Sequence, residues 1–200
     1  MELIPVFELG LWNAWILQVI YFIVSMQPLV FKRLLKGNIG DDTKKLKNIS
    51  PTHVKKTWHS KMLYWLLFII FIISFIVTFF LPLQMESSWF YLGIILFIIG
   101  LFLIVFVIQS WITSTLNRPI TSGIYHYSRH PMYISFFCSY IGICIATLSL
   151  LFLILTFIQI SLTILQARSE EEYCVLKYGE LYQKYIEETP RWIGFQNLVK

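Results

Sequence analysis

Charged side chains are scarce in this sequence, and their scarcity excludes an ordinary soluble protein. Asp, Glu, Lys and Arg make up 14% of the 200 residues, whereas soluble domains carry about 25%. Hydrophobic residues supply 57% of the chain and aromatic residues 18%. This composition predicts an integral membrane protein, and the length fits a single domain over residues 1–200.

Cysteines are also few, and their spacing is typical of neither a disulfide framework nor a metal site. Cys138 and Cys144 lie in an apolar segment, where a free cysteine behaves as a small hydrophobic residue. His126 and His130 are four residues apart, but Pro131 argues against a continuous helix, and no third ligand lies nearby. We therefore predict no bound metal.

Several functional motifs are missing. The sequence contains no G-x-S-x-G element, no Gly-rich phosphate loop and no dinucleotide fingerprint. The net charge of +5 comes without the basic patch interleaved with aromatic residues that single-stranded nucleic acid needs, so we predict no nucleic-acid partner. The first residues include Glu2 and Glu8 but no Lys or Arg, which is not the pattern of a signal peptide.

Long apolar runs are what the sequence does contain, and they predict five transmembrane helices. Residues 9–31, 62–81 and 89–112 are each long enough for a span, which takes about 20 residues. The run 134–165 is too long for one span, and small polar residues at 146–149 predict a turn within it. The predicted fold is an all-α integral membrane protein whose last two spans form a helical hairpin.

The distribution of Lys and Arg predicts the orientation of these spans. Nine of the sixteen lie in residues 32–61, two in the loop after the third span and five in the C-terminal tail. Because cytoplasmic segments carry the excess of basic residues, we expect the N-terminus outside and the C-terminus in the cytosol. Such a multi-pass protein would lie in the cell membrane of a prokaryote or the endoplasmic reticulum of a eukaryote, with residues 32–61 touching anionic lipid.

A polar, basic loop over residues 117–133 separates the third span from the hairpin. Pro131 suits the first position of the next helix, because its missing N–H has no intrahelical partner there. The start of that helix carries free N–H groups and roughly half a positive charge, and Arg129 and His130 stand beside it. The combination predicts an anion site at the membrane surface.

The tail after the hairpin is amphipathic, and we expect it to lie against the inner membrane face, over the loop. Residues 168–188 carry an apolar, aromatic side that is interrupted at Gly179. This pattern predicts two short helices, the second of which ends before Pro190.

Three consecutive carboxylates, Glu170, Glu171 and Glu172, follow directly from the last span. Beside a negatively charged lipid surface they are unfavourable unless a positive partner is present. That partner is either Arg168, three and four residues before Glu171 and Glu172, or a cationic ligand.

Five short motifs follow one another in the second half of the chain: Gly123-Ile124-Tyr125, Arg129-His130-Pro131-Met132-Tyr133, Glu170-Glu171-Glu172, Tyr178-Gly179-x-x-Tyr182-x-x-Tyr185 and Thr189-Pro190-Arg191. As an ordered set they resemble the isoprenylcysteine carboxyl methyltransferase family, whose relatives include the phospholipid N-methyltransferases. The resemblance covers residues 117–195. It implies one membrane methyltransferase-like domain, with three spans and a basic cytosolic loop in residues 1–112 and a cofactor loop, the hairpin and a C-terminal lid in residues 113–200.

The resemblance implies an enzyme that uses S-adenosylmethionine to methylate a lipophilic acceptor at the inner membrane face, foremost the carboxyl group of a protein isoprenylcysteine. The acceptor would enter from the bilayer. The implied catalytic residues, near the reaction centre, are Glu170, Glu171 and Arg129. The implied cofactor-binding residues are Ile120, Gly123, Tyr125, His130, Pro131, Tyr133, Tyr182, Pro190 and Arg191. Among these, His130 and Tyr133 would hold the amino-acid end of the cofactor.

One position departs from the family pattern. Many members carry an Arg four residues before the first Glu of the acidic motif, where it can hold an acceptor carboxylate, and this chain has Gln166 there. Arg168 lies about 200° around a helix from that position. N- or S-methylation of a lipid or small hydrophobic acceptor is therefore an alternative.

Two further interpretations stay open. The run Cys174-x-x-Lys177-Tyr178-Gly179 is also similar to the C-terminal end of membrane sterol reductases, which use NADPH and are generally much longer. The second interpretation is a non-enzymatic membrane protein with the same fold, because a fold alone does not determine a function.

Overall fold

The structure is a computed structural model that describes residues 9–10, 12–35, 58–114 and 118–194. The helices are α1 (Trp15–Leu35), α3 (Trp58–Thr78), α4 (Ser88–Ile112), η2 (Gly123–His126, a 3₁₀ helix), α5 (Pro131–Thr147), α6 (Leu150–Tyr178) and α7 (Glu180–Glu188). The described residues form no β-strand beyond an isolated bridge between Asn13 and Pro82. The predicted all-α class is confirmed.

Three of these helices are long and apolar enough to cross a membrane: Ser60–Thr78, Ser88–Ile112 and Leu150–Tyr178. Trp15–Met26 in α1 and the whole of α5 are shorter apolar helices. With 17 residues, α5 is about 26 Å long, slightly less than the hydrocarbon thickness of about 30 Å. The chain is thus a helical membrane protein. The basic segment that the sequence places between the first two spans lies mainly outside the described residues.

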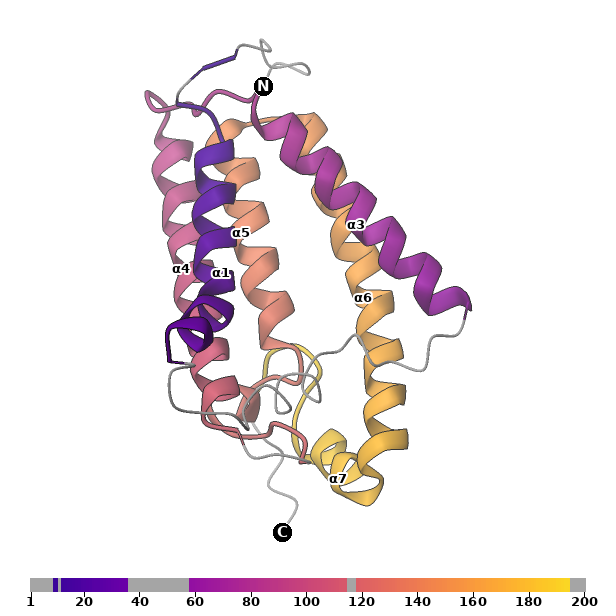
Figure 1. The fold of residues 1–200 in the computed structure, drawn as a ribbon. Helices are drawn as coiled ribbons and strands as arrows, with labels where there is room; N and C mark the ends of the chain where they lie inside the picture. Colours follow the sequence, from indigo (N-terminus) through magenta and orange to yellow (C-terminus); the bar gives the residue numbers. More distant parts are fainter. Residues whose placement is uncertain (1–8, 11, 36–57, 115–117, 195–200) are drawn as a thin grey trace.

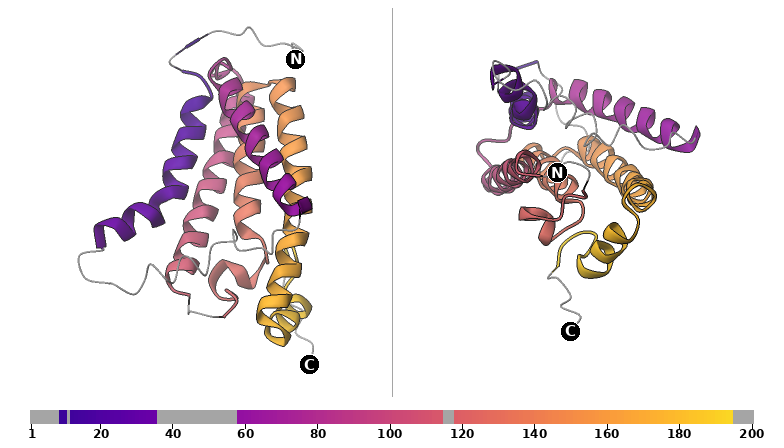
Figure 2. Two further views of the ribbon diagram at one scale, coloured as in Figure 1. Left: turned by 45° about the vertical axis from the view of Figure 1, so that its right-hand side comes forward. Right: turned by 60° about the horizontal axis from the view of Figure 1, so that its bottom comes forward.

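The ribbon forms two groups of helices that run in roughly the same direction (Figure 1). Helices α1, α4 and α5 lie together in one group, and α3 lies along α6 in the other. Helix α7 folds back at the lower end of α6, near η2 and the first turn of α5. Helix α1 bends in its second half (Figure 2); Pro28 lies in that half, and proline is the commonest cause of such kinks.

Helices α4 and α5 approach each other closely because glycines face the partner helix. A Cβ atom on Gly142 would lie 2.7 Å from the carbonyl oxygen of Gly93, and one on Gly100 would lie 2.9 Å from that of Ser135. The Ser135 hydroxyl also donates to the Gly100 carbonyl at 2.8 Å. Small residues of this kind let membrane helices pack backbone to backbone. This contact fixes the position of α5, the helix that begins at the end of the basic loop.

Buried polar groups tie α1 and α3 to α5. The Gln18 amide donates to the Tyr140 hydroxyl at 2.8 Å, and the Thr78 hydroxyl donates to the Gln18 amide oxygen at 3.0 Å. All three side chains are buried. In a membrane, such bonds between helices give each polar group a partner that lipid cannot supply.

The second arm of the hairpin differs from the prediction. The sequence suggested a span that ends at residue 165 and a separate tail helix from 168, but α6 is one helix of 29 residues, Leu150–Tyr178. No Gly or Pro interrupts it before Gly179, and residues such as Gln, Ala, Arg and Glu favour helix. The predicted break at Gly179 is present, with α7 directly after it.

The turn of the hairpin falls within residues 146–149, as expected. Leu148 takes a left-handed conformation (φ 51°), and the Ser149 hydroxyl accepts the backbone N–H of Phe152 at 3.2 Å. The first arm begins at Pro131, which occupies the first helical position of α5 as predicted, three residues before the apolar run that starts at residue 134.

Candidate active site

An open cavity of about 150 Å³ lies where the basic loop, the first turn of α5, the end of α6 and α7 meet. Seven of the residues that the resemblance implies line it: Ile120, Tyr125, Arg129, His130, Tyr133, Glu170 and Tyr182. These residues come from segments that are up to 62 positions apart in the sequence. The fold therefore gathers the loop and the tail at one end of the helix bundle.

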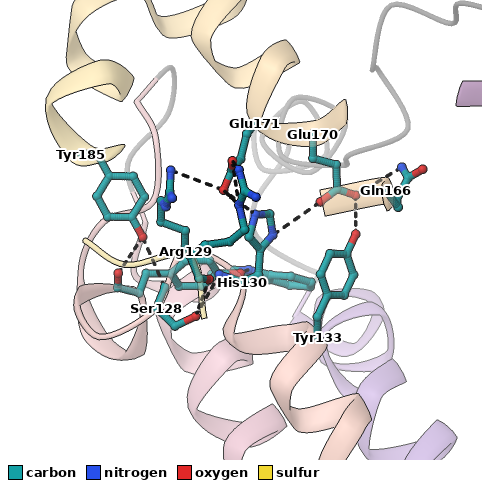
Figure 3. Close-up of polar contacts among 11 residues, drawn as sticks. Ser128, Arg129, His130, Tyr133, Gln166, Glu170, Glu171 and Tyr185 are labelled. Atoms are coloured by element: carbon teal, nitrogen blue, oxygen red, sulfur yellow. Dashed lines mark hydrogen bonds and ion pairs between the residues drawn. The ribbon is translucent and has the colours of Figure 1, made fainter. Parts of the chain in front are cut away.

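The ring of His130 lies between two carboxylates, as Figure 3 shows. Its Nε2 atom is 3.1 Å from Oε1 of Glu171, and its Nδ1 atom is 3.9 Å from Oε2 of Glu170. The ring stacks on Tyr133 with the centroids 5.4 Å apart and the planes 5° from parallel. His130 is the N-cap of α5 and is buried, so its ring is held in one orientation.

The second carboxylate oxygen of Glu170, Oε1, has two polar neighbours. The Tyr133 hydroxyl donates to Oε1 of Glu170 at 2.6 Å, and the Gln166 amide is 3.5 Å from the same oxygen. Gln166 precedes Glu170 by one helical turn, which places the two side chains on one face of α6. Oε2 of Glu170 is left facing His130 and the cavity.

Apart from His130, Glu171 has different partners from those of Glu170. Nε of Arg191 donates to both of its oxygens at 3.1 Å, and Nη1 of Arg129 lies 3.4 Å from Oε1. Glu171 is buried. Its cationic partners come from the loop and the C-terminal segment, rather than from Arg168, which the sequence suggested and which is exposed. The hydrogen bonds to Glu171 raise the pKa of Arg191, because they stabilise the charged guanidinium.

Two donor atoms of the Arg129 side chain lack a hydrogen-bond partner among the described residues. Its side chain is 9% exposed, yet within the described part of the chain its Nε and Nη1 atoms have no hydrogen-bond partner. A buried guanidinium normally satisfies its donors, because an unpaired buried polar group is costly. Nη1 lies 3.4 Å from Oε1 of Glu171, so Arg129 contributes a buried positive charge to the wall of the cavity that it lines.

Residues 189–194, which we call the C-terminal strap, cross over the loop. The backbone N–H of Arg129 donates to the Pro190 carbonyl at 3.1 Å, and the Ser128 hydroxyl donates to the Arg191 carbonyl at 3.2 Å. From α7, the Tyr185 hydroxyl donates to the Tyr125 carbonyl at 2.6 Å. Burial raises the pKa of Tyr185 well above its usual value, so the phenol keeps the proton that it donates.

Gly123 adopts φ +66° at the start of η2, and a Cβ atom there would overlap with Oγ of Ser110. We expect Gly123→Ala to lower the free energy of unfolding by about 2–4 kcal/mol, from the left-handed backbone and the overlap together. Thermal unfolding in detergent measures the change. Gly179→Ala is the control for the overlap, because Gly179 also has a positive φ (+58°) but open space, and it should lose only the backbone strain of about 1–3 kcal/mol. Equal losses would contradict the role of Ser110.

Five of the implied site residues do not line the cavity: Gly123, Pro131, Glu171, Pro190 and Arg191. They support its walls instead. Gly123 lies against α4, Pro131 begins α5, and Pro190 holds the loop through its carbonyl. Glu171 contacts the cavity wall through His130 and Arg129.

The cavity lining also contains residues that were not implied as site residues: Trp111, Arg118, Pro119, Met132, Cys174, Tyr178 and Tyr185. Tyr178 and Tyr185 belong to the tyrosine-rich tail motif, which was the available signal. From the sequence, Trp111 is expected only to be an interfacial residue at the end of a span. The fold shows that its indole N–H donates to the Tyr125 hydroxyl at 2.7 Å. In the parts of the chain that are described, no three His, Cys, Asp or Glu side chains group as metal ligands.

Fold and site together define a helical membrane protein with a carboxylate-, imidazole- and tyrosine-lined cavity at one end of its bundle. Residues 88–181 match the model of the phospholipid methyltransferase family. This segment, which runs from α4 to the first residues of α7, is thus similar to a family of membrane methyltransferases, as the motifs indicated. Comparisons with curated proteins and with solved structures gave no match.

Proposed function

We propose that the cavity binds S-adenosylmethionine and that the protein transfers a methyl group from it to a lipophilic acceptor. The observation that carries this proposal is the convergence of His130, Tyr133 and Glu170 on one cavity. The family match supports methyl transfer over the reductase and non-enzymatic interpretations.

The chemistry of the lining fits such a donor. Six aromatic side chains line the cavity: Trp111, Tyr125, Tyr133, Tyr178, Tyr182 and Tyr185. Aromatic rings attract onium cations such as a sulfonium, and the carboxylate of Glu170 adds a negative charge. The positive charge of Arg129 in the cavity wall suits the carboxylate of an amino acid. At about 150 Å³ the cavity is smaller than sites for whole cofactors, which reach about 300–1,000 Å³. It therefore fits the charged, amino-acid end of the cofactor.

S-adenosylmethionine supplies an electrophilic methyl group when it is bound. The protein's own contribution is to hold the reacting atoms in line and to keep water away. Tyr133 fixes Glu170 through Oε1 and leaves Oε2 free.

The charges around Glu170 favour an amine acceptor. Glu170 brings a negative charge to the cavity, and its neighbour on the same face of α6, Gln166, is neutral. A carboxylate acceptor would be repelled by Glu170, whereas an amine would not. The isoprenylcysteine carboxyl group is the second candidate, and the exposed Arg118 in the cavity lining favours it.

Cys174 lines the cavity and provides a direct test. In a chain with Cys138→Ala and Cys144→Ala, S-adenosylmethionine should slow modification of Cys174 by a thiol reagent at least fivefold, because the ligand covers the thiol. His130→Ala should abolish this protection without loss of the folded, inserted protein. NADPH serves as the control ligand. Protection by NADPH, or by neither compound, would contradict the proposal.

The acceptor is identified with the same protein and a labelled methyl donor. Amine lipids and a prenylcysteine are compared in detergent micelles. We expect label in the amine lipid, and label in the prenylcysteine alone would make the carboxyl group the acceptor.

A further inference from the structure

We propose that Glu171 is a positioning residue that fixes the tautomer of His130, so that the unprotonated Nδ1 of the ring and Oε2 of Glu170 form a binding pair for an ammonium group. The inference rests on the proposed function, because the ammonium is that of the methyl donor's amino-acid end. It assigns different roles to two neighbouring carboxylates. Glu170 contacts the ligand, and Glu171 acts through His130.

The first step is that Glu171 is occupied and does not line the cavity. Oε1 is shared by His130 Nε2 and Arg191 Nε, each at 3.1 Å, and Oε2 also accepts from Arg191. Arg129 lies 3.4 Å away on the other side. Two guanidinium groups keep this carboxylate ionised, and an ionised carboxylate can only accept hydrogen bonds.

The second step is that Nε2 of His130 must therefore carry a hydrogen. In a neutral imidazole the other nitrogen, Nδ1, then has a free lone pair. Turning the ring over would place carbon atoms against Glu171 and lose this bond. The parallel stack on Tyr133 and the contact with Trp192, at 5.8 Å between centroids, hold the ring plane.

The third step concerns the gap between Nδ1 and Glu170. The distance of 3.9 Å from Nδ1 to Oε2 is too long for a hydrogen bond between them. Oε1 of Glu170 already accepts from Tyr133 at 2.6 Å. Two acceptors that are 3.9 Å apart can both be reached by one ammonium nitrogen about 2.8 Å from each. The pair is thus built for a group with several N–H donors.

The tautomer can be measured directly. Protein with ¹⁵N-labelled histidine in detergent micelles gives ring-nitrogen shifts that distinguish both neutral tautomers and the imidazolium, and the His130→Ala spectrum assigns the signal. We expect His130 with a protonated Nε2 and an unprotonated Nδ1, and we expect this preference to be lost in Glu171→Gln. An imidazolium, or a hydrogen on Nδ1, would overturn the inference. The wild-type spectrum decides this even if the variant does not fold.

A binding measurement distinguishes the role of Glu171 from that of Glu170. Glu171→Gln should weaken S-adenosylhomocysteine binding about tenfold, the lower end of the losses found when the residue that orients a metal-binding His is changed, and should leave a deaminated analogue unaffected. In a His130→Ala background the same substitution should cost nothing further. Glu172→Gln, on an exposed neighbour, is the control. Equal losses for both ligands, or losses that add to those of His130→Ala, would overturn the inference. If neither ligand binds wild-type protein, the proposed function fails, and the tautomer is still decided by the spectrum.

Discussion

Glu170→Gln should reduce methyl transfer by about 10²–10³-fold and leave the protein folded and inserted. The substitution keeps the shape of the side chain but removes its negative charge from the cavity. It also removes the charge of one of the two acceptors that face each other 3.9 Å apart, Oε2 of Glu170 and Nδ1 of His130. A fixed charge in a protein cavity has more effect on a reacting group than the same charge in water. The assay follows label from the methyl donor into extracted lipid.

The control for this substitution is Glu172→Gln, two residues further along α6. Glu172 is exposed, so we expect its substitution to leave the rate within about twofold, as is usual for surface positions. Similar rates for Glu170→Gln and Glu172→Gln would place Glu170 outside the reaction centre. A Tm that falls in parallel with the rate would instead indicate a loss of folding.

Arg191→Ala should lower the free energy of unfolding by about 3 kcal/mol. Removing one partner of a buried ion pair costs about 3–5 kcal/mol, because the other charge stays buried without compensation. We expect the lower end, because Arg129 still lies 3.4 Å from Glu171 and the Arg191 side chain is 34% exposed. Equilibrium unfolding in detergent measures the change. Hydrogen exchange should show residues 189–194 opening in the variant.

Lys184→Ala is the matched control for Arg191→Ala. Lys184 pairs with Glu188 at 3.7 Å on the exposed side of α7, and such surface pairs contribute about 1 kcal/mol or less. A loss for Arg191→Ala as small as that for Lys184→Ala would mean that Glu171 does not depend on the strap.

Much of the fold could be predicted from the sequence, because its helices are determined locally. Apolar runs of sufficient length, Gly179 and the small residues at 146–149 each act over a few positions. The extent of α6 was mispredicted, because the change from apolar to polar residues after 165 marks the end of a span and not the end of a helix. The contact of Gln18 with Tyr140 joins residues 122 positions apart, and no local pattern reports it.

The site was located by motif order, but the separate roles of its residues could not be read from that order. Adjacent residues of a helix point about 100° apart. Glu170 therefore faces the cavity while Glu171 faces Arg191. Which of the two carboxylates faces inward depends on how α6 is rotated against α5 and the strap, and tertiary packing sets that rotation.

Because α6 continues without a break, its length sets the height of Glu170 relative to the hydrocarbon layer. Its 29 residues span about 43 Å, more than the hydrocarbon layer of about 30 Å. Glu170 follows the apolar run ending at residue 165 by five positions, a rise of about 7.5 Å. The length of α6 thus places the Glu170 carboxylate at the level of the lipid headgroups. A lipid could present its headgroup there while its tails stay in the bilayer, and a molecule whose reactive group sits deeper would pass beneath it.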